Sequence, residues 1–194
     1  MKLSKVKKVC LDASEIIVKR ADTGIDVRTW IGTNSALYPV RGLDMSAELA
    51  IRIWEIEPKK LRDFEINQDT DENEATTLIT REELEKISFM GDTFSDAYEQ
   101  ETPGLVNIAT INNWNILEDK KTGKAWAMRA NKLEPVEGTR LLFIPIEENR
   151  NLIAIYADGI LEAAVYAFPW KRNDYLKSII QEIALICRAE GEEP

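Results

Sequence analysis

The sequence predicts an α+β fold, in which antiparallel β meanders carry helices packed on one face. Short apolar segments alternate with turn residues in the first forty positions and again in residues 139–168. Each of these regions is followed by a segment in which apolar residues recur every three or four positions, as on one face of a helix. An apolar content of 44% in a chain of 194 residues is enough for a buried core.

The N-terminal region reads as strands followed by a helix. We expect four strands, at residues 6–12, 14–21, 25–31 and 35–40. Pro39 cannot donate a hydrogen bond to a neighbouring strand, so the fourth strand ends there or lies at a sheet edge. A helix over residues 46–56 follows, because Asp44 or Ser46 can cap it and an apolar stripe runs along it.

The last third of the chain repeats this order. We expect three strands, at residues 139–146, 152–157 and 160–168. Asp158 and Gly159 are typical of a tight hairpin between the second and third of these strands. A helix over residues 174–188 follows, and residues 105–117 and 124–130 give a further hairpin upstream.

The two regions share an order of elements that raises the alternatives of internal duplication and coincidence. Tyr38 and Tyr166 both stand in the last strand before a helix, although identity between the regions is very low. We expect one compact domain in three parts. These are an N-terminal meander-plus-helix unit, an acidic and partly irregular insertion, and a C-terminal meander-plus-helix unit, at residues 1–62, 63–104 and 105–194.

Charge is distributed unevenly along the chain. Residues 63–101 contain 13 acidic and 2 basic residues, a local net charge of −11 within a chain of net charge −9. The rest of the chain keeps 21 acidic and 23 basic residues, a net charge of +2. The sequence therefore predicts a nearly neutral protein with one acidic segment in its middle.

The composition excludes several kinds of catalytic and metal site. The chain has no histidine and only two cysteines, Cys10 and Cys187. Serine–histidine and cysteine–histidine nucleophile systems, and the usual zinc sites, all need residues that are missing. Both cysteines lie in apolar segments, which indicates buried thiols. We expect no cofactor and no metal.

The acidic segment supplies the first candidate interaction residues, Asp69, Asp71, Glu72 and Glu74. Asp69, Asp71 and Asn73 have the spacing of the first three ligands of a calcium loop, but Glu74 stands where such a loop needs glycine. A solvated acidic loop that contacts a protein partner is the better interpretation.

Aromatic and basic residues supply the remaining candidates, Trp30, Trp170 and Arg172. Trp30 falls on the polar side of its expected strand, and Trp170 stands beside Lys171 and Arg172 at a strand-to-helix junction. If exposed, they would be interface anchors, because interfaces are enriched in tryptophan and arginine. The alternative for each tryptophan is burial in the core.

These observations predict a non-enzymatic cytoplasmic binding or accessory protein that acts through protein–protein interaction with an unknown partner. Apolar residues on both faces of several strands favour a homodimer, and no membrane association is expected because no long apolar run exists. The first alternative is a nucleic-acid-associated protein, clamp-like or a DNA-binding accessory factor. It depends on basic groups at residues 2–8, 19–20, 59–62 and 171–172 converging on one face. The second is a carboxylate- and metal-dependent enzyme.

Overall fold

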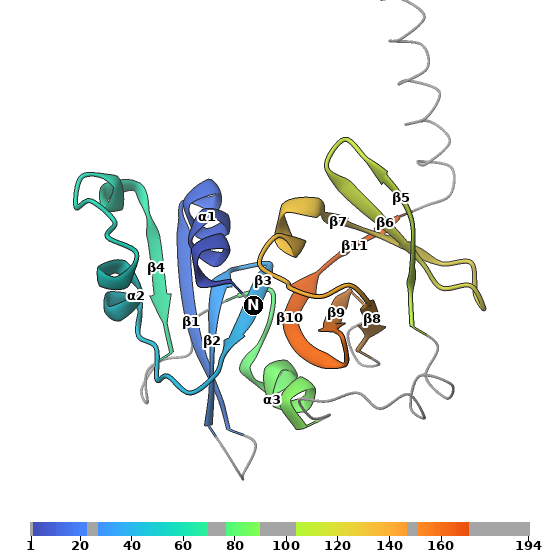
Figure 1. Ribbon diagram of the computed structural model, residues 1–194, viewed down its shortest axis with the longest axis horizontal. Helices are drawn as coiled ribbons and strands as arrows, with labels where there is room; N and C mark the ends of the chain where they lie inside the picture. Colours follow the sequence, from blue (N-terminus) through green and yellow to red (C-terminus); the bar gives the residue numbers. More distant parts are fainter. Residues whose placement is uncertain (1, 23–26, 70–76, 90–103, 147–150, 171–194) are drawn as a thin grey trace, which may run out of the picture.

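The computed structural model describes residues 2–22, 27–69, 77–89, 104–146 and 151–170, which form two β-sheets with helices around them (Figure 1). The large sheet has the strand order β4-β1-β2-β3-β10-β9-β8. Its strands are β1 (Glu15–Asp22), β2 (Val27–Thr33), β3 (Ala36–Val40), β4 (Glu65–Gln68), β8 (Leu141–Pro145), β9 (Leu152–Ala157) and β10 (Ile160–Tyr166). All neighbours pair antiparallel except β1 and β4, which are parallel.

The small sheet has the strand order β11-β7-β6-β5 and is antiparallel throughout. Its strands are β5 (Val106–Ile111), β6 (Trp114–Glu118), β7 (Ala125–Arg129) and β11 (Phe168–Trp170). The helices in the described ranges are α1 (Leu3–Ala13), α2 (Ala47–Ile53), α3 (Arg81–Phe89) and the short 3-10 helices η1 (Lys60–Asp63) and η2 (Ala130–Leu133). The predicted α+β class is confirmed, and the expected helix at residues 174–188 lies outside the described residues.

The prediction of a strand at residues 6–12 is wrong, because these residues belong to α1. Val6, Val9 and Cys10 are buried and stand three and four positions apart, which is the spacing of one helix face. The same apolar residues also give a broken alternation, and this imitates a strand with two partly apolar faces. Ser14 ends the helix in the left-handed conformation.

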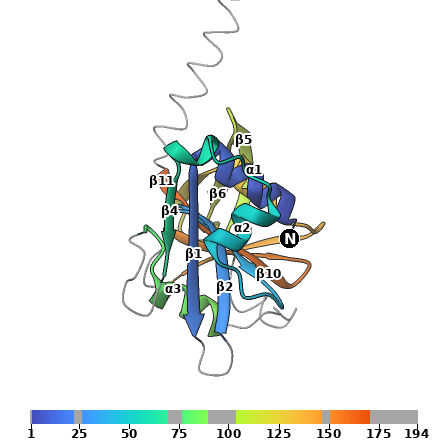
Figure 2. The ribbon, with the colours of Figure 1, turned by 90° about the vertical axis from the view of Figure 1, so that its left-hand side faces the viewer.

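The prediction that the helices share one face of the sheet also needs correction. One core cluster joins α1 and α2 to the large sheet through residues such as Val9, Ala50 and Tyr38. A second cluster lies on the opposite face, where Leu84 and Ile87 of α3 pack beside Trp30 and Leu37 of the sheet. The helices therefore cover both faces (Figure 2). Both faces of the central strands are apolar, so each face needs its own cover.

The acidic middle of the chain contributes directly to the fold. Its strand β4 extends the large sheet beside β1, and its helix α3 packs on that sheet. Thr80 and Glu83 form a capping box: the Thr80 backbone N–H donates to Glu83 Oε2 at 2.7 Å, and the Glu83 N–H donates to Thr80 Oγ1 at 3.3 Å. This reciprocal pair fixes where α3 begins.

The large sheet places the two meanders on either side of a central pair, β3 and β10. Such an antiparallel pair is related by a twofold axis perpendicular to the sheet, which keeps each side chain on its own face. Tyr38 belongs to the cluster under α1, whereas Tyr166 packs against the cluster under α3. The two tyrosines are therefore not equivalent under this symmetry. The internal duplication stays a prediction, although the strand order is compatible with it.

The small sheet packs on the α1 face of the large sheet. Leu117 and Trp126 of the small sheet lie in the same core cluster as Ile155 and Val165 of the large sheet. The chain passes from one sheet into the other between β10 and β11, with only Ala167 between the two strands. The edge of this junction is where α1, η2 and both sheets meet.

Candidate functional site

The junction of the two sheets contains a hollow of about 590 Å³. It is built from segments far apart in the sequence: the end of α1, the start of β1, the β2–β3 turn, the β5–β6 turn, η2 and β11. Its charged and aromatic lining residues are Asp12, Glu15, Trp114, Arg129, Lys132 and Phe168, and Ser35 also lines it. Concave sites with few polar groups and aromatic walls are the usual places for ligands.

Lys132 is the unusual group in this hollow, because only 8% of the residue is exposed. Its ammonium donates to Ser35 Oγ at 2.6 Å and to the Ser35 carbonyl at 3.3 Å, which also holds the β2–β3 turn. Burial, with a smaller contribution from the nearby positive charge of Arg129, lowers the pKa of Lys132 to about 8, while Glu15 acts in the opposite direction. Lys132 is thus a poorly solvated cation at neutral pH.

Tyr38 fixes η2, and with it Lys132, against the large sheet. Its hydroxyl donates to the Lys132 carbonyl at 2.8 Å, and burial raises the pKa of this hydroxyl well above its ordinary range. On the outer side, Lys5 and Lys8 of α1 form ion pairs with Glu134 directly after η2. The wall of the hollow that carries Lys132 is therefore held by both a buried and an exposed contact.

Arg129 lies at the rim and supplies a second positive charge. Its guanidinium carbon lies 4.5 Å from the centre of the Trp114 ring, a cation–π contact. No carboxylate in the described part of the chain lies within ion-pair distance of Arg129. Two cations thus share the hollow and repel each other. An anion that binds between them would reduce this electrostatic repulsion.

Glu15 partly balances this charge from the start of β1. Its carboxylate accepts a hydrogen bond of 2.6 Å from the backbone N–H of Asn34. Burial raises the pKa of Glu15, while this hydrogen bond and the charge of Lys132 act in the opposite direction. The carboxylate is thus already engaged by the β2–β3 turn.

Aromatic side chains form the outer wall of the hollow. Phe168 is 47% exposed, and its ring meets Trp114 edge-to-face at 6.2 Å between centroids. On its other side it meets Tyr166 at 5.8 Å, again edge-to-face. This arrangement leaves an apolar, partly exposed surface directly beside the two cations.

Lys132→Met tests the electrostatic cost at the site. The folded-state pKa, about 8, lies below the ordinary 10.5, so the unfolded chain binds more protons between these values. The buried Lys132 ammonium destabilises the folded protein fully below about pH 8, and this destabilisation decreases as the pH rises towards 10.5. We expect wild type to gain about 2 kcal/mol relative to the variant between about pH 7 and about pH 9.5. Urea unfolding of both proteins at both pH values measures this, and a constant difference would contradict it.

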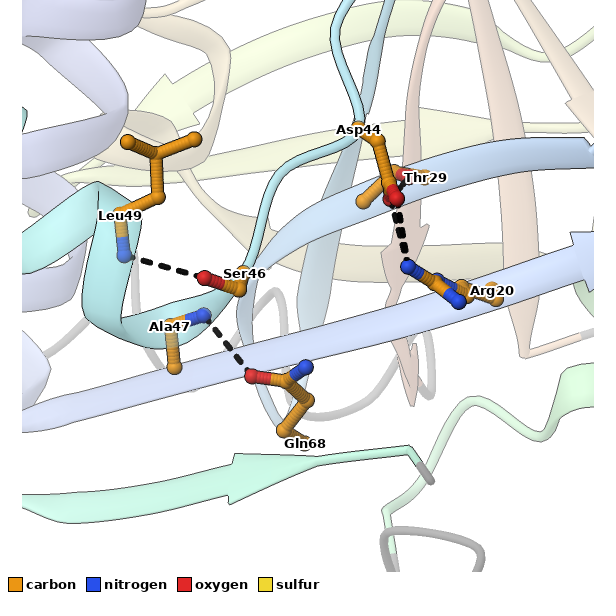
Figure 3. Close-up of polar contacts among 7 residues, drawn as sticks. All are labelled: Arg20, Thr29, Asp44, Ser46, Ala47, Leu49 and Gln68. Atoms are coloured by element: carbon orange, nitrogen blue, oxygen red, sulfur yellow. Dashed lines mark hydrogen bonds and ion pairs between the residues drawn. The ribbon is translucent and has the colours of Figure 1, made fainter. Parts of the chain in front are cut away.

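A second hollow, of about 610 Å³, lies between the ends of β1, β2 and β3 and the segment before α2. Arg20, Arg28 and Arg41 line it. Figure 3 shows Arg20 and Thr29 directed at Asp44, with the Arg20 guanidinium 2.6 Å and 2.8 Å from the two carboxylate oxygens. Arg41 is held by Glu162 at 3.0 Å. Carboxylates of the chain thus already neutralise Arg20 and Arg41, unlike Arg129.

The contacts beside this second hollow have a structural role. Ser46 caps α2 by accepting from the Leu49 N–H at 3.1 Å, as the sequence predicts (Figure 3). Gln68 of β4 accepts from the Ala47 N–H at 2.9 Å, which joins α2 to the edge of the large sheet.

The sequence-predicted interaction residues are not gathered in one place. Asp69 is buried and pairs with Arg81 at 3.2 Å, so it stabilises the fold next to α3. Trp30 is fully buried in the core and cannot be an exposed anchor in this fold. Trp170 is partly exposed on β11 but is not among the residues that line the hollow. Asp71, Glu72, Glu74 and Arg172 lie outside the described residues.

Several of the basic residues of the N-terminal half are paired with carboxylates. Lys2 pairs with Glu137, and Lys5 and Lys8 pair with Glu134. Lys19 is 1% exposed, and Arg20 pairs with Asp44. Carboxylates thus compensate Lys2, Lys5, Lys8 and Arg20 within the fold, whereas Lys59, Lys60 and Arg62 form no ion pair among the described residues. Nucleic-acid binding stays an alternative prediction with a smaller basic surface.

The residues that do form the hollow escaped sequence reasoning. Lys132 stands in "RANKLEP" and Trp114 in "INNWN", and neither segment resembles a known site. The only local signal is a lysine close to the apolar residues Ala130 and Leu133. Tertiary packing alone brings Lys132, Arg129 and Glu15 together.

Comparison with known proteins gives no match for this chain among family models, curated proteins or solved structures. Within the described residues, no helix is long and apolar enough to cross a membrane. The same residues contain no group of three or more acidic or cysteine side chains that could hold a metal ion. Cys10 is buried and its thiol is free, and burial raises its pKa to about 12. The function must therefore be argued from the hollow itself.

Proposed function

We propose that this protein is a non-enzymatic binding protein that acts through protein–protein interaction, and that the hollow at the sheet junction receives an acidic side chain of the partner. The observation that carries this proposal is the pair of cations, Arg129 and Lys132, which share one hollow beside an aromatic wall.

The two cations offer different contacts to a carboxylate. Arg129 presents a planar guanidinium that suits two parallel hydrogen bonds, and its stacking on Trp114 limits its motion. Lys132 supplies a point charge from a buried position in the wall of the hollow, where poor solvation strengthens the attraction. An anion between them would raise the pKa of Lys132 towards its ordinary value, so binding in this hollow is coupled to proton uptake near pH 8.

The wall of the hollow favours a protein partner over a free anion. Phe168 and Trp114 offer apolar surface next to the charges, and aromatic residues and arginine dominate the energetics of protein interfaces. A partner segment with an acidic residue beside an apolar one would satisfy both parts of the site.

A titration with a defined peptide tests this proposal. The probe is a terminally blocked peptide of alternating glutamate and leucine, with a glutamine–leucine peptide of equal length as its neutral match. We expect the acidic peptide to bind and to perturb the Trp114 indole signal in NMR spectra, and Arg129→Gln to weaken binding about 10-fold, or about 1.4 kcal/mol. Arg52→Gln, at an exposed position of α2, should leave the affinity unchanged.

Two outcomes would contradict the proposal. Equal binding of the neutral peptide would show that the negative charge does not contribute to recognition. Unchanged affinity of the Arg129→Gln variant would show that the peptide binds outside the hollow. Raising the salt concentration should weaken binding of the acidic peptide, because Arg129 is exposed and its attraction is screened.

A further inference from the structure

The strand β5 is an edge that lacks the charged residues and the proline by which many proteins protect edges, although its pairing with β6 contains a bulge between Asn107 and Ala109. All six of its residues are uncharged, none is proline, and Val106 and Ile108 are 37% and 46% exposed. It lies at the margin of the small sheet, with β6 as its only strand partner within the described chain (Figure 1). Long, uncharged, apolar edges are templates for pairing with another chain.

The other three edges of the two sheets are protected. β4 is only four residues long and begins with Glu65. β11 has Pro169 at its centre, and β8 ends with Pro145. The outer side of β8 is also partly occupied, because the Leu105 N–H donates to the Phe143 carbonyl at 2.8 Å. Among the described edges, β5 is thus the one that has neither a charged residue nor proline.

The side chains of β5 are complementary to those of a second, antiparallel β5. Asn107 and Thr110 lie on one face, since both contact Asn115 Oδ1, at 3.5 Å and 2.7 Å. They share a face despite their three-residue spacing because the pairing with β6 shifts register between Asn107 and Ala109. Val106 and Ile111 lie on the opposite face, paired with Glu118 and Trp114 of β6.

A twofold axis that passes between the two paired β5 strands, level with Ile108 and Ala109, would place apolar residues opposite apolar ones and polar residues opposite polar ones. Val106 would face Ile111 of the second copy, and Asn107 would face its Thr110. Symmetric association requires a surface to complement itself, and like charges opposite each other oppose it. Since β5 carries no charge, no such repulsion arises along the strand.

Exposed apolar surface continues beside the strand. A hollow of about 460 Å³ lies between the start of β5 and β8, lined by Gly104–Asn107 and Leu141–Phe143. Leu141 at its rim is 36% exposed. Pairing at β5 would cover this surface together with Val106, which adds a hydrophobic contribution to the backbone hydrogen bonds.

We propose that β5 pairs antiparallel with β5 of a second copy of this chain, so that two four-stranded sheets become one eight-stranded sheet. This association uses a different surface from the cationic hollow and does not depend on it. The two surfaces are nevertheless close, because β5 ends directly before the turn that carries Trp114. Dimerisation therefore places the start of the second copy's β5 near that turn.

Sedimentation velocity of the full chain over a range of concentrations tests the proposal, with Ile108→Lys as the blocking variant. A lysine on an edge strand disfavours pairing. We expect wild type to dimerise reversibly and Ile108→Lys to raise the dimer dissociation constant at least about 10-fold, with an unchanged circular dichroism spectrum. Ile160→Lys is the matched control, because Ile160 is 42% exposed on a strand that is not an edge.

A crosslinking experiment checks the register. Chains with Asn107→Cys are mixed with chains carrying Thr110→Cys and oxidised, and the crosslinked peptide is identified by mass spectrometry. The disulfide should form between the two kinds of chain and not within either kind alone. A wild-type monomer at every concentration overturns the proposal. A dimer that persists in Ile108→Lys and forms no crosslink overturns it too, because association then uses another surface.

Discussion

Gly32→Ala is expected to lower the free energy of unfolding by about 4 kcal/mol, one of the largest effects of any single methyl group in this fold. A β carbon at Gly32 would lie 2.0 Å from the Ala36 carbonyl oxygen, far inside the contact distance. The backbone cannot move away easily, because β2 pairs with β1 on one side and β3 on the other. From above, the Cys10 thiol of α1 donates to the Gly32 carbonyl at 3.3 Å.

The control for this prediction is Gly123→Ala. Gly123 has a positive φ of 66°, but no atom lies within 4 Å of the position that its β carbon would take. Its cost is conformational only, about 1 kcal/mol. Urea unfolding followed by circular dichroism compares the two variants. Equal losses of stability would show that the turn after β2 adapts to the added methyl group.

Trp30→Ala is expected to lower the free energy of unfolding by about 4 kcal/mol, through lost burial and the cavity left behind. The side chain is 0% exposed and lies in the core cluster between α3 and the large sheet, with Ile17, Leu37 and Leu84. Its indole nitrogen is buried and has no hydrogen-bond partner among the described residues. Trp30→Phe should therefore cost much less, about 1 to 2 kcal/mol, since no hydrogen bond is lost.

This pair of variants also separates core packing from recognition. If Trp30 stabilises only the fold, Trp30→Phe keeps the affinity for the acidic peptide while Trp30→Ala unfolds at a much lower urea concentration. Loss of peptide binding in a fully folded Trp30→Phe protein would support the sequence-based interpretation of Trp30 as an interface residue.

Local signals predicted much of the fold. Gly159 follows Asp158 in a turn where both residues have positive φ, and this turn joins β9 to β10 as the sequence predicts. The capping box of α3 is a second local feature, because Thr80 and Glu83 stand three positions apart in the sequence. Both features depend on residues a few positions apart, so the sequence carries their physical cause directly.

Long-range pairing was harder to predict. The four residues of β4, "EINQ", have too little apolar character to signal a strand, and β4 forms because it adds in parallel to β1. In α1, three buried residues suit both a helix stripe and a poor strand. The face of the large sheet that α1 covers decides between them, and sequence periodicity does not contain that information.

The candidate site was the least predictable part. Lys132 is important because it is buried next to Arg129, and burial is a property of the assembled fold. Asp69 shows the reverse, because an acidic residue that looks solvent-exposed in the sequence is paired with Arg81 inside the structure. Charge in a sequence therefore gives little information on which groups are left without a counter-charge.

The central pair of the large sheet has a consequence for how the protein is made. Ala36 of β3 pairs with Val165 of β10, so nearly the whole described chain must leave the ribosome before this contact can form. All five residues of β3 are buried in the finished protein. Until β10 arrives, the nascent chain exposes this apolar edge, and contacts between such distant residues form slowly. We expect biogenesis to depend on protection of β3 during synthesis.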